Sequence, residues 1–106
     1  MVKTYNKLVR DKIPEIIEKS GNKCVIDILN DSEYLQKLDE KINEELIEFR
    51  EGYSLEELCD LLEVLYAMAK VKGYSLEDIK KTRLKKNEER GAFDKKILLK
   101  EVIEQG

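Results

Sequence analysis

Residues 58–71 have the sequence Leu58-Cys-Asp-Leu-Leu-Glu-Val-Leu-Tyr-Ala-Met-Ala-Lys-Val71, and this stretch decides the fold. On a helix of 3.6 residues per turn, its apolar side chains would cover nearly the whole circumference. A helix in a small monomeric bundle needs only one apolar face, whereas a helix enclosed by other copies of the chain needs several. The stretch therefore predicts a helix that is buried in an assembly of at least two copies.

Glycines and small polar residues divide the rest of the chain into further helices. Four isolated glycines each follow a run of helix formers, which is typical of the residue just past a helix end. Ser54-Leu-Glu-Glu57 predicts a complete capping box, and Ser75-Leu-Glu-Asp78 predicts a second one with Asp in place of Glu or Gln. The glycines are Gly21, Gly52, Gly73 and Gly91, and the other start signals are Asp11 and either Asp31 or Ser32.

These signals predict an all-α fold, a bundle of four to five helices in a single domain that spans residues 1–106. The segment Cys24–Leu29 is rich in β-branched residues and suits a short strand, but no other segment offers it a clear partner. The expected helices cover residues 12–20, 32–51, 55–72 and 76–90, with a fifth over residues 94–105.

Composition restricts the chemistry that the chain can perform. Its 106 residues include 20 Lys plus Arg, 23 Asp plus Glu, and no His. The lack of histidine excludes the Ser-His-Asp and Cys-His triads and the HExxH zinc helix, so acid-base or metal chemistry must use carboxylates. Cys24 and Cys59 suit reduced thiols in a cytoplasmic protein. The sequence has neither a membrane-spanning apolar run nor an apolar signal-peptide core behind Met1–Lys7, so we expect no membrane partner and a cytoplasmic location.

Four carboxylates lie within or beside the apolar faces of two neighbouring predicted helices. On the helix expected over residues 55–72, Glu57 and Asp60 fall within the apolar arc. On the preceding helix, Glu45 lies at the edge of the apolar arc and Glu48 about 60° further round. The short turn 52–54 predicts an antiparallel hairpin, which would bring all four together. Such an oxygen-rich set suits Mg²⁺, or alternatively Mn²⁺.

Simpler explanations of these carboxylates stay open at this point. Glu57 occupies the third position of its helix, where a capping role would explain it, but Asp60 lies beyond the cap. The whole set could also form salt bridges in a helical bundle without any metal. The other acidic residues of the two helices are more typical of a solvated surface; they are Glu44, Glu51, Glu56 and Glu63.

Basic residues are segregated from the acidic ones. Residues 27–63 hold 13 acidic and three basic side chains, whereas residues 70–100 hold 11 basic and five acidic ones. The acidic centre argues against a nucleic-acid partner, because it would repel a long polyanion, and favours a small polyphosphate bridged by metal. The candidate phosphate-binding residues are Lys86 and Arg90, spaced i, i+4 on one helix, and Lys7, Arg10 and Lys12 near the N-terminus.

Four motifs together resemble a known family. The sequence EELIE at 44–48, followed by ELCD at 57–60, is similar to the signature of the all-α nucleoside triphosphate pyrophosphohydrolases, the MazG-like superfamily. The opening YNKLVRDKIP at 5–14 and the late KNEERGAF at 86–93 resemble its house-cleaning branch, which is related to phosphoribosyl-ATP pyrophosphohydrolase. The resemblance covers nearly the whole chain.

The resemblance implies an activity and roles for particular residues. It implies Mg²⁺-dependent hydrolysis of a nucleoside triphosphate to a monophosphate and pyrophosphate, by a dimer or tetramer. The residues that it implies are Glu45, Glu48, Glu57 and Asp60 as metal ligands, and Lys86 and Arg90 as phosphate ligands. Glu48, furthest from the apolar arc, is our candidate for activating the attacking water, and Glu45 is the other catalytic candidate. The alternatives are phosphoribosyl-ATP pyrophosphohydrolase and a non-catalytic helical oligomer that binds nucleic acid through its basic helix.

Overall fold

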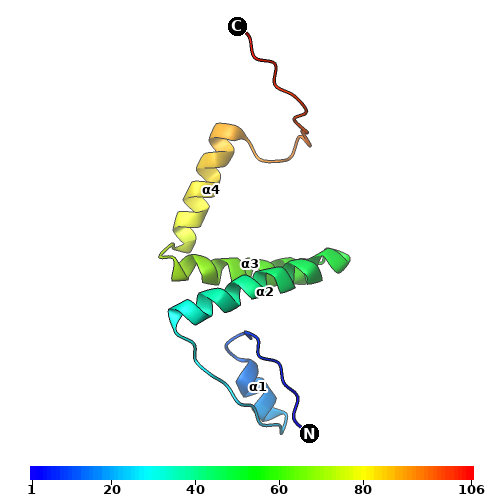
Figure 1. Ribbon diagram of the computed structural model, residues 1–106, viewed down its shortest axis with the longest axis vertical. Coiled ribbons are helices and arrows are strands. Elements are labelled where there is room, and N and C mark those ends of the chain that lie inside the picture. Colours follow the sequence, from blue (N-terminus) through cyan, green and yellow to red (C-terminus); the bar gives the residue numbers. More distant parts are fainter. The chain divides into compact units, whose positions relative to one another are not determined.

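The computed structural model describes residues 1–106 and contains four helices and no strand. This confirms the predicted all-α class. The helices are α1 (Ile13–Lys19), α2 (Asp31–Gly52), α3 (Leu55–Val71) and α4 (Leu76–Arg90) (Figure 1). The chain divides into two units, Met1–Tyr74 and Ser75–Gly106, and each is described by itself. No helix combines the length and apolar content that crossing a lipid bilayer requires.

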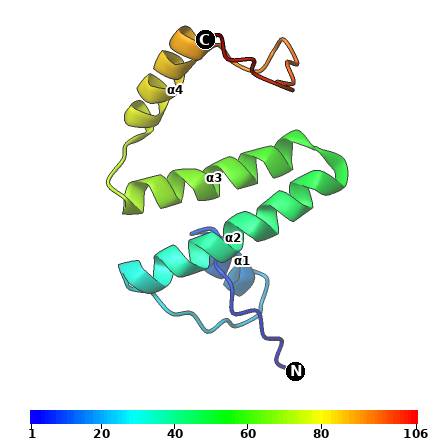
Figure 2. The same ribbon diagram turned by 45° about the horizontal axis from the view of Figure 1, so that its top comes forward.

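The first unit is built around a hairpin of α2 and α3. The two helices run antiparallel and are joined by the two residues Tyr53 and Ser54 (Figure 2). The predicted glycine cap at Gly52 is wrong, because Gly52 is still helical and Tyr53 adopts the left-handed conformation with φ 53°. The Tyr53 backbone N–H donates to the Phe49 carbonyl at 2.7 Å, and the two rings meet edge to face at 5.3 Å. These contacts hold a non-glycine residue where glycine is the usual choice.

The interface between α2 and α3 contains the two buried residues of the chain. Leu38 is 3% exposed and Glu45 is 7% exposed. They are seven residues apart, which places them on the same face of α2 two turns from each other. A carboxylate therefore occupies a position at which the apolar pattern of the hairpin would place a second hydrophobic side chain.

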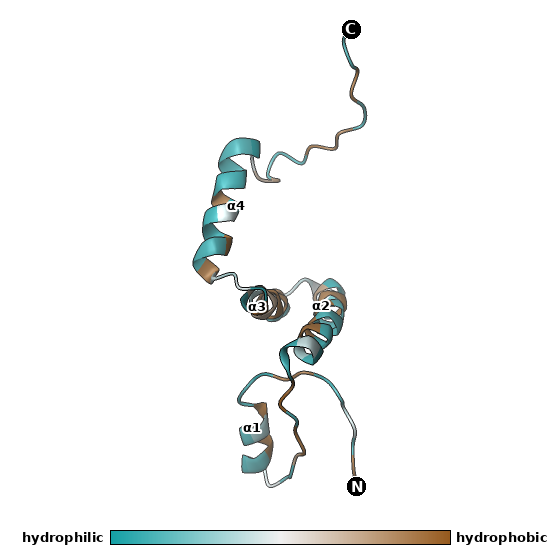
Figure 3. Ribbon diagram, turned by 60° about the vertical axis from the view of Figure 1, so that its left-hand side comes forward, coloured by the Kyte–Doolittle hydropathy of each residue, from teal (hydrophilic) through white to brown (hydrophobic).

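Helix α3 keeps much of its apolar surface exposed in the single chain. None of its residues is buried, and Leu62 and Leu65 are 37% and 42% exposed. Apolar residues cover most of α3, whereas α4 is mainly hydrophilic (Figure 3). The single chain thus leaves part of the apolar surface of α3 uncovered.

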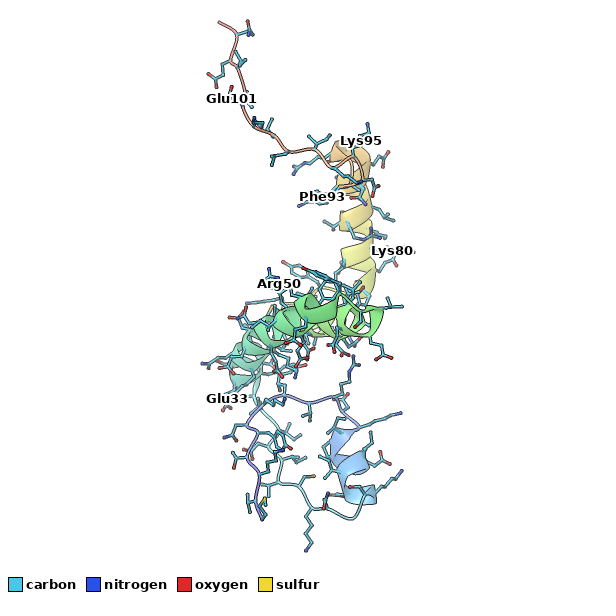
Figure 4. All side chains as sticks on the ribbon, turned by 90° about the vertical axis from the view of Figure 1, so that its right-hand side faces the viewer. Glu33, Arg50, Lys80, Phe93, Lys95 and Glu101 are labelled. Carbon is cyan, nitrogen blue, oxygen red and sulfur yellow. The ribbon has the colours of Figure 1, made fainter.

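The second unit consists of α4 and the segment that follows it. Helix α4 ends at Arg90, and Gly91 follows with φ 82°, as predicted for its C-cap. Phe93 and Lys95 lie just beyond the helix, and Glu101 lies further along the segment (Figure 4). The predicted helix over residues 94–105 is wrong. Its apolar residues find nothing to pack against; Ile97, Leu98, Leu99, Val102 and Ile103 are all at least 73% exposed.

The segment Cys24–Leu29 forms no strand. A strand needs hydrogen bonds to a neighbouring strand, and the chain contains no second strand to supply them. The side chain of Cys24 is instead half-buried near α1, where its Sγ lies 3.9 Å from the Pro14 carbonyl oxygen.

Candidate metal site

Three of the four predicted carboxylates come together at the turn end of the hairpin. Glu45, on α2, faces Glu57 and Asp60, which lie on the first two turns of α3. One carboxylate oxygen from each residue lies within 4.8 Å of the other two. The group forms because the short link between the helices places the end of α2 beside the start of α3. We call these three residues the acidic cluster.

Glu45 is the most enclosed member of the acidic cluster. Its side chain is 9% exposed, and its Oε1 accepts a salt bridge from Lys41 Nζ at 3.3 Å. Its other oxygen, Oε2, is buried and has no hydrogen-bond donor in the chain. Burial raises the pKa of Glu45 above its ordinary value, the nearby Glu48 charge raises it further, and the Lys41 ammonium only partly opposes them. A buried oxygen without a donor is costly, so this atom needs a partner that the chain does not provide.

Glu57 contributes a second such oxygen. Its backbone N–H donates to Ser54 Oγ at 3.2 Å, which is half of the predicted capping box. The other half, from the Ser54 N–H to the Glu57 carboxylate, is not formed, so the prediction of a complete box is wrong here. The Glu57 side chain instead points toward Glu45, and its Oε2 is buried without a donor. The carboxylate is therefore available for something other than capping.

Asp60 is the member of the cluster that binds a cation from the N-terminal segment. Arg10, from the segment before α1, donates from Nη2 to Asp60 Oδ1 at 2.6 Å. The side chains of Arg10 and Asp60 are 59% and 40% exposed. This hydrogen bond, together with the charges of Asp60, Glu63 and Glu45, raises the pKa of Arg10 further above its ordinary value. The guanidinium is thus held in the electric field of the acidic cluster.

Two lysines bind the neighbouring Glu44. Lys7 Nζ donates to Glu44 Oε1 at 3.2 Å, and Lys41 Nζ lies 3.3 Å from Glu44 Oε2. Burial opposes ionisation of Glu44, but the lysine hydrogen bonds outweigh it and lower its pKa. Sequence reasoning missed Lys41, although it is one of only three bases in residues 27–63 and precedes Glu44 and Glu45 by three and four residues. On a helix this spacing predicts salt bridges from Lys41 to Glu44 and Glu45.

The remaining predicted site residues lie outside the acidic cluster. Glu48 is close enough for its charge to raise the pKa of Glu45, but its carboxylate is not among the grouped oxygens. Three of the four predicted carboxylates thus form the group, and the role of Glu48 as a fourth ligand stays a prediction. Lys12 is the exposed residue that precedes α1. Lys86 and Arg90 are exposed on α4, in the second unit, and their part in the site stays a prediction.

The donor set fits a hard divalent cation. Two carboxylates about 5 Å apart repel by roughly 3 kcal/mol at an effective dielectric constant near 20. Arg10 and Lys41 offset part of this repulsion, but each uses only one oxygen of its partner, at Asp60 and Glu45. Glu45 and Glu57 each contribute a buried oxygen without a donor. All three residues of the cluster offer carboxylate oxygens, and none offers a nitrogen or sulfur ligand. Mg²⁺ and Mn²⁺ prefer such oxygen ligands.

An uncharacterized protein of Mycolicibacterium smegmatis is 52% identical over 44 residues, which cover 42% of this chain. The match spans 45% of that relative's own length. No family model matches the chain, and no solved structure matches it.

Proposed function

We propose that the chain is a Mg²⁺-dependent nucleotide pyrophosphohydrolase, which hydrolyses a nucleoside triphosphate to a monophosphate and pyrophosphate. One observation carries the proposal: two buried carboxylate oxygens without donors, on Glu45 and Glu57, lie in a cluster with Asp60. The similarity of the EELIE and ELCD motifs to the MazG-like pyrophosphohydrolases supplies the reaction. House-cleaning of non-canonical or excess nucleotides in the cytoplasm is the corresponding role.

Each residue of the cluster has a task in this proposal. Glu45, Glu57 and Asp60 hold the cation, because one carboxylate oxygen of each lies within 4.8 Å of the other two. A Mg²⁺ ion held by these carboxylates would neutralise charge on the phosphate oxygens and help to orient them. Glu45 also fixes the position of the site, since its side chain is enclosed between α2 and α3 and held by Lys41.

Glu48 is the proposed general base. It lies one helical turn from Glu45, half-buried, and outside the grouped carboxylates. A carboxylate beside the cation, but not required to hold it, can accept the proton of a water molecule. The water oxygen bonds to the phosphorus atom on one side of the bridge between the α and β phosphates. The bond from that phosphorus to the bridging oxygen breaks, and the proton of the water passes to Glu48.

The N-terminal segment provides two of the positive charges that lie close to the acidic cluster. Lys7 and Arg10 reach the hairpin through Glu44 and Asp60, and Lys12 follows them in the same segment. The i, i+4 pair of Lys86 and Arg90 on α4 is the proposed second phosphate-binding element. Guanidinium and ammonium groups stabilise the charge of phosphate oxygens through charge-assisted hydrogen bonds.

We also propose that the chain acts as a homo-oligomer, a dimer or a tetramer. Leu62 and Leu65 on the apolar α3 are exposed in the single chain, and only one apolar side chain, that of Leu38, is buried. A second copy that packs on the hairpin would bury this surface, which supplies the main driving force for association. Sedimentation of the wild-type chain should show an oligomer, and Leu65→Glu should dissociate it.

A substrate panel tests the activity. The wild-type chain is incubated with Mg²⁺ and canonical or damaged nucleoside triphosphates, with phosphoribosyl-ATP as a separate arm, and the released phosphate species are identified. We expect pyrophosphate and a nucleoside monophosphate. Release of orthophosphate, or no release in any arm, would contradict the proposal and favour a structural salt-bridge network around the cluster. Preferential cleavage of phosphoribosyl-ATP would assign the chain to that reaction instead.

A further inference from the structure

The segment before α1 is attached to the hairpin by polar side-chain contacts. Lys7 bonds to Glu44, Arg10 bonds to Asp60, and the Asn6 carbonyl oxygen accepts from Lys37 Nζ at 3.5 Å. Residues 1–12 form no helix or strand of their own. Two of the three contacts join a cation on this segment to a carboxylate on the hairpin.

Of these contacts, the one between Arg10 and Asp60 directly involves the acidic cluster. At 2.6 Å it is shorter than the 3.2 Å contact between Lys7 and Glu44. Asp60 is one of the three proposed cation ligands, whereas Glu44 is not in the cluster. Arg10 therefore places a positive charge on an oxygen of the carboxylate that a divalent cation would use.

We propose that Arg10 is the counter-cation of the acidic cluster and that a divalent cation competes with it for Asp60. Both are positively charged, so they repel each other at short range, and they need the same carboxylate. The buried Glu45 and Glu57 oxygens cannot be served by Arg10, which reaches Asp60 alone, so a small cation can satisfy atoms that the guanidinium leaves without donors. Binding of the cation then breaks the contact between Arg10 and Asp60.

The consequence for catalysis depends on the proposed function. A guanidinium released from Asp60 remains beside the cluster, because Lys7 still ties the same segment to Glu44. When the substrate is bound, a phosphate oxygen becomes available to it as a partner and competes with the nearby Glu63 carboxylate. Arg10 would then bind phosphate only after the cation has bound, so the cation would bind before the phosphate.

Metal titration tests the competition without requiring turnover. Mn²⁺ binding to the wild-type chain and to Arg10→Gln is measured by the electron paramagnetic resonance signal of free Mn²⁺. We expect Arg10→Gln to bind Mn²⁺ about threefold to tenfold more tightly, because the cation no longer displaces a salt-bridge partner. Unchanged or weaker binding would overturn the proposal.

The matched control removes a charge from the same segment without touching a carboxylate. Lys3 lies near the Tyr5 ring and makes no salt bridge. Lys3→Gln should leave the Mn²⁺ affinity within about twofold of wild type, because only distant, screened charge is lost. An equal gain in Lys3→Gln and Arg10→Gln would mean that general charge, rather than the contact with Asp60, sets the affinity, and would also overturn the proposal.

A measurement on the wild-type chain guards against misfolding of the variants. Side-chain NMR signals of the Arg10 guanidinium, assigned through Arg10→Lys, are followed during titration with Mg²⁺. Displacement from Asp60 should move these signals at the same Mg²⁺ concentration that saturates the site, and stationary signals would contradict the proposal. If Arg10 responds but no triphosphate is hydrolysed, the competition stands and the proposed activity fails; the reverse result rejects the competition alone.

Discussion

Helices α3 and α4 begin with nearly the same sequence but use it differently. Both starts place Ser at the N-cap and an acidic residue three positions later, in Ser54-Leu-Glu-Glu57 and Ser75-Leu-Glu-Asp78. At α4 the box is complete, since Ser75 Oγ accepts from the Asp78 N–H at 3.0 Å and Asp78 accepts from the Ser75 N–H at 2.9 Å. At α3 only the serine bond forms, at 3.2 Å.

The difference follows from what lies beside each helix start. Asp78 is exposed, and the nearby backbone N–H is the best donor available to it. Glu57 has a longer side chain and faces Glu45 across the hairpin, where its Oε2 is buried without a donor. The Glu57 side chain makes no capping bond and places a buried oxygen among carboxylates, whereas the Asp78 side chain completes its cap, so Glu57 is the better candidate for a functional residue. The two positions therefore form a natural pair for experiment.

The largest expected effect is a difference in turnover between variants of Glu57 and of Asp78. Glu57→Gln should reduce turnover about 10²- to 10³-fold, because a neutral amide cannot hold the cation against the phosphate charge. Asp78→Asn should leave turnover near the wild-type level. Pyrophosphate release at saturating Mg²⁺ measures both, with circular dichroism to show that each variant is folded. Comparable losses in the two variants would erase the distinction between a cluster residue and a capping residue.

The next effect concerns stabilisation by metal. A cation at 100 times its dissociation constant stabilises the folded protein by about 2.7 kcal/mol, so Mg²⁺ should raise the wild-type unfolding temperature. Glu45→Gln should lose most of this rise, whereas Asp78→Asn should keep it. Without Mg²⁺, Glu45→Gln should be at least as stable as wild type, since burial and Glu48 already disfavour the charge on Glu45. Thermal melts with Mg²⁺ and with a chelator measure this; a normal Mg²⁺ response in Glu45→Gln would place the metal elsewhere.

Local sequence signals predicted the helices well and the uses of side chains less well. The bounds of α1 to α4 agree with the expected helices within one residue at each end, because capping residues and helix periodicity act over a few neighbours. The angular position of Asp60 also predicted its place beside Glu45. Whether Glu57 caps its helix or turns inward depends on Glu45, twelve residues earlier, and no pattern within the capping box contains that information.

The wrong helix at the C-terminal segment and the unforeseen partner of Arg10 have the same origin. Leu98 and Val102 have helical spacing, but a periodic pattern forms a helix only when its apolar face has something to pack on, and both remain exposed. The phosphate role of Arg10 stays a prediction, but its partner in this structure is Asp60, fifty residues away, and the sequence did not indicate that contact. Contacts between distant segments decide both cases, and a single sequence does not show which distant residues come into contact.

The serine hydroxyls at the two helix starts should differ by a smaller amount. Replacing an N-cap serine with alanine typically costs about 1 kcal/mol of helix stability. Ser75→Ala should destabilise the start of α4 more than Ser54→Ala destabilises that of α3, because Asp78 also closes the Ser75 cap whereas the start of α3 is supported by packing on α2. Hydrogen exchange of the Glu57 and Asp78 amides reports each cap separately. Equal increases in exchange would show that the second bond of the box adds nothing.

The smallest effect is a difference in the sign of pH dependence. Hydrogen bonds from the Ser75 backbone and side chain lower the pKa of Asp78 below its ordinary value of 3.8, whereas burial raises that of Glu45 above 4.5. The ionised Asp78 supports α4 fully above its ordinary pKa, and this support is lost as the pH falls through the lowered value. For Glu45 the sign reverses, so without metal its ionisation weakens the hairpin as the pH rises through the raised value. Carboxyl ¹³C titrations with a chelator present should show the two shifts in opposite directions. A lowered pKa for Glu45 would mean that the Lys41 ammonium outweighs burial and the Glu48 charge, which would contradict the enclosed position of Glu45 between α2 and α3.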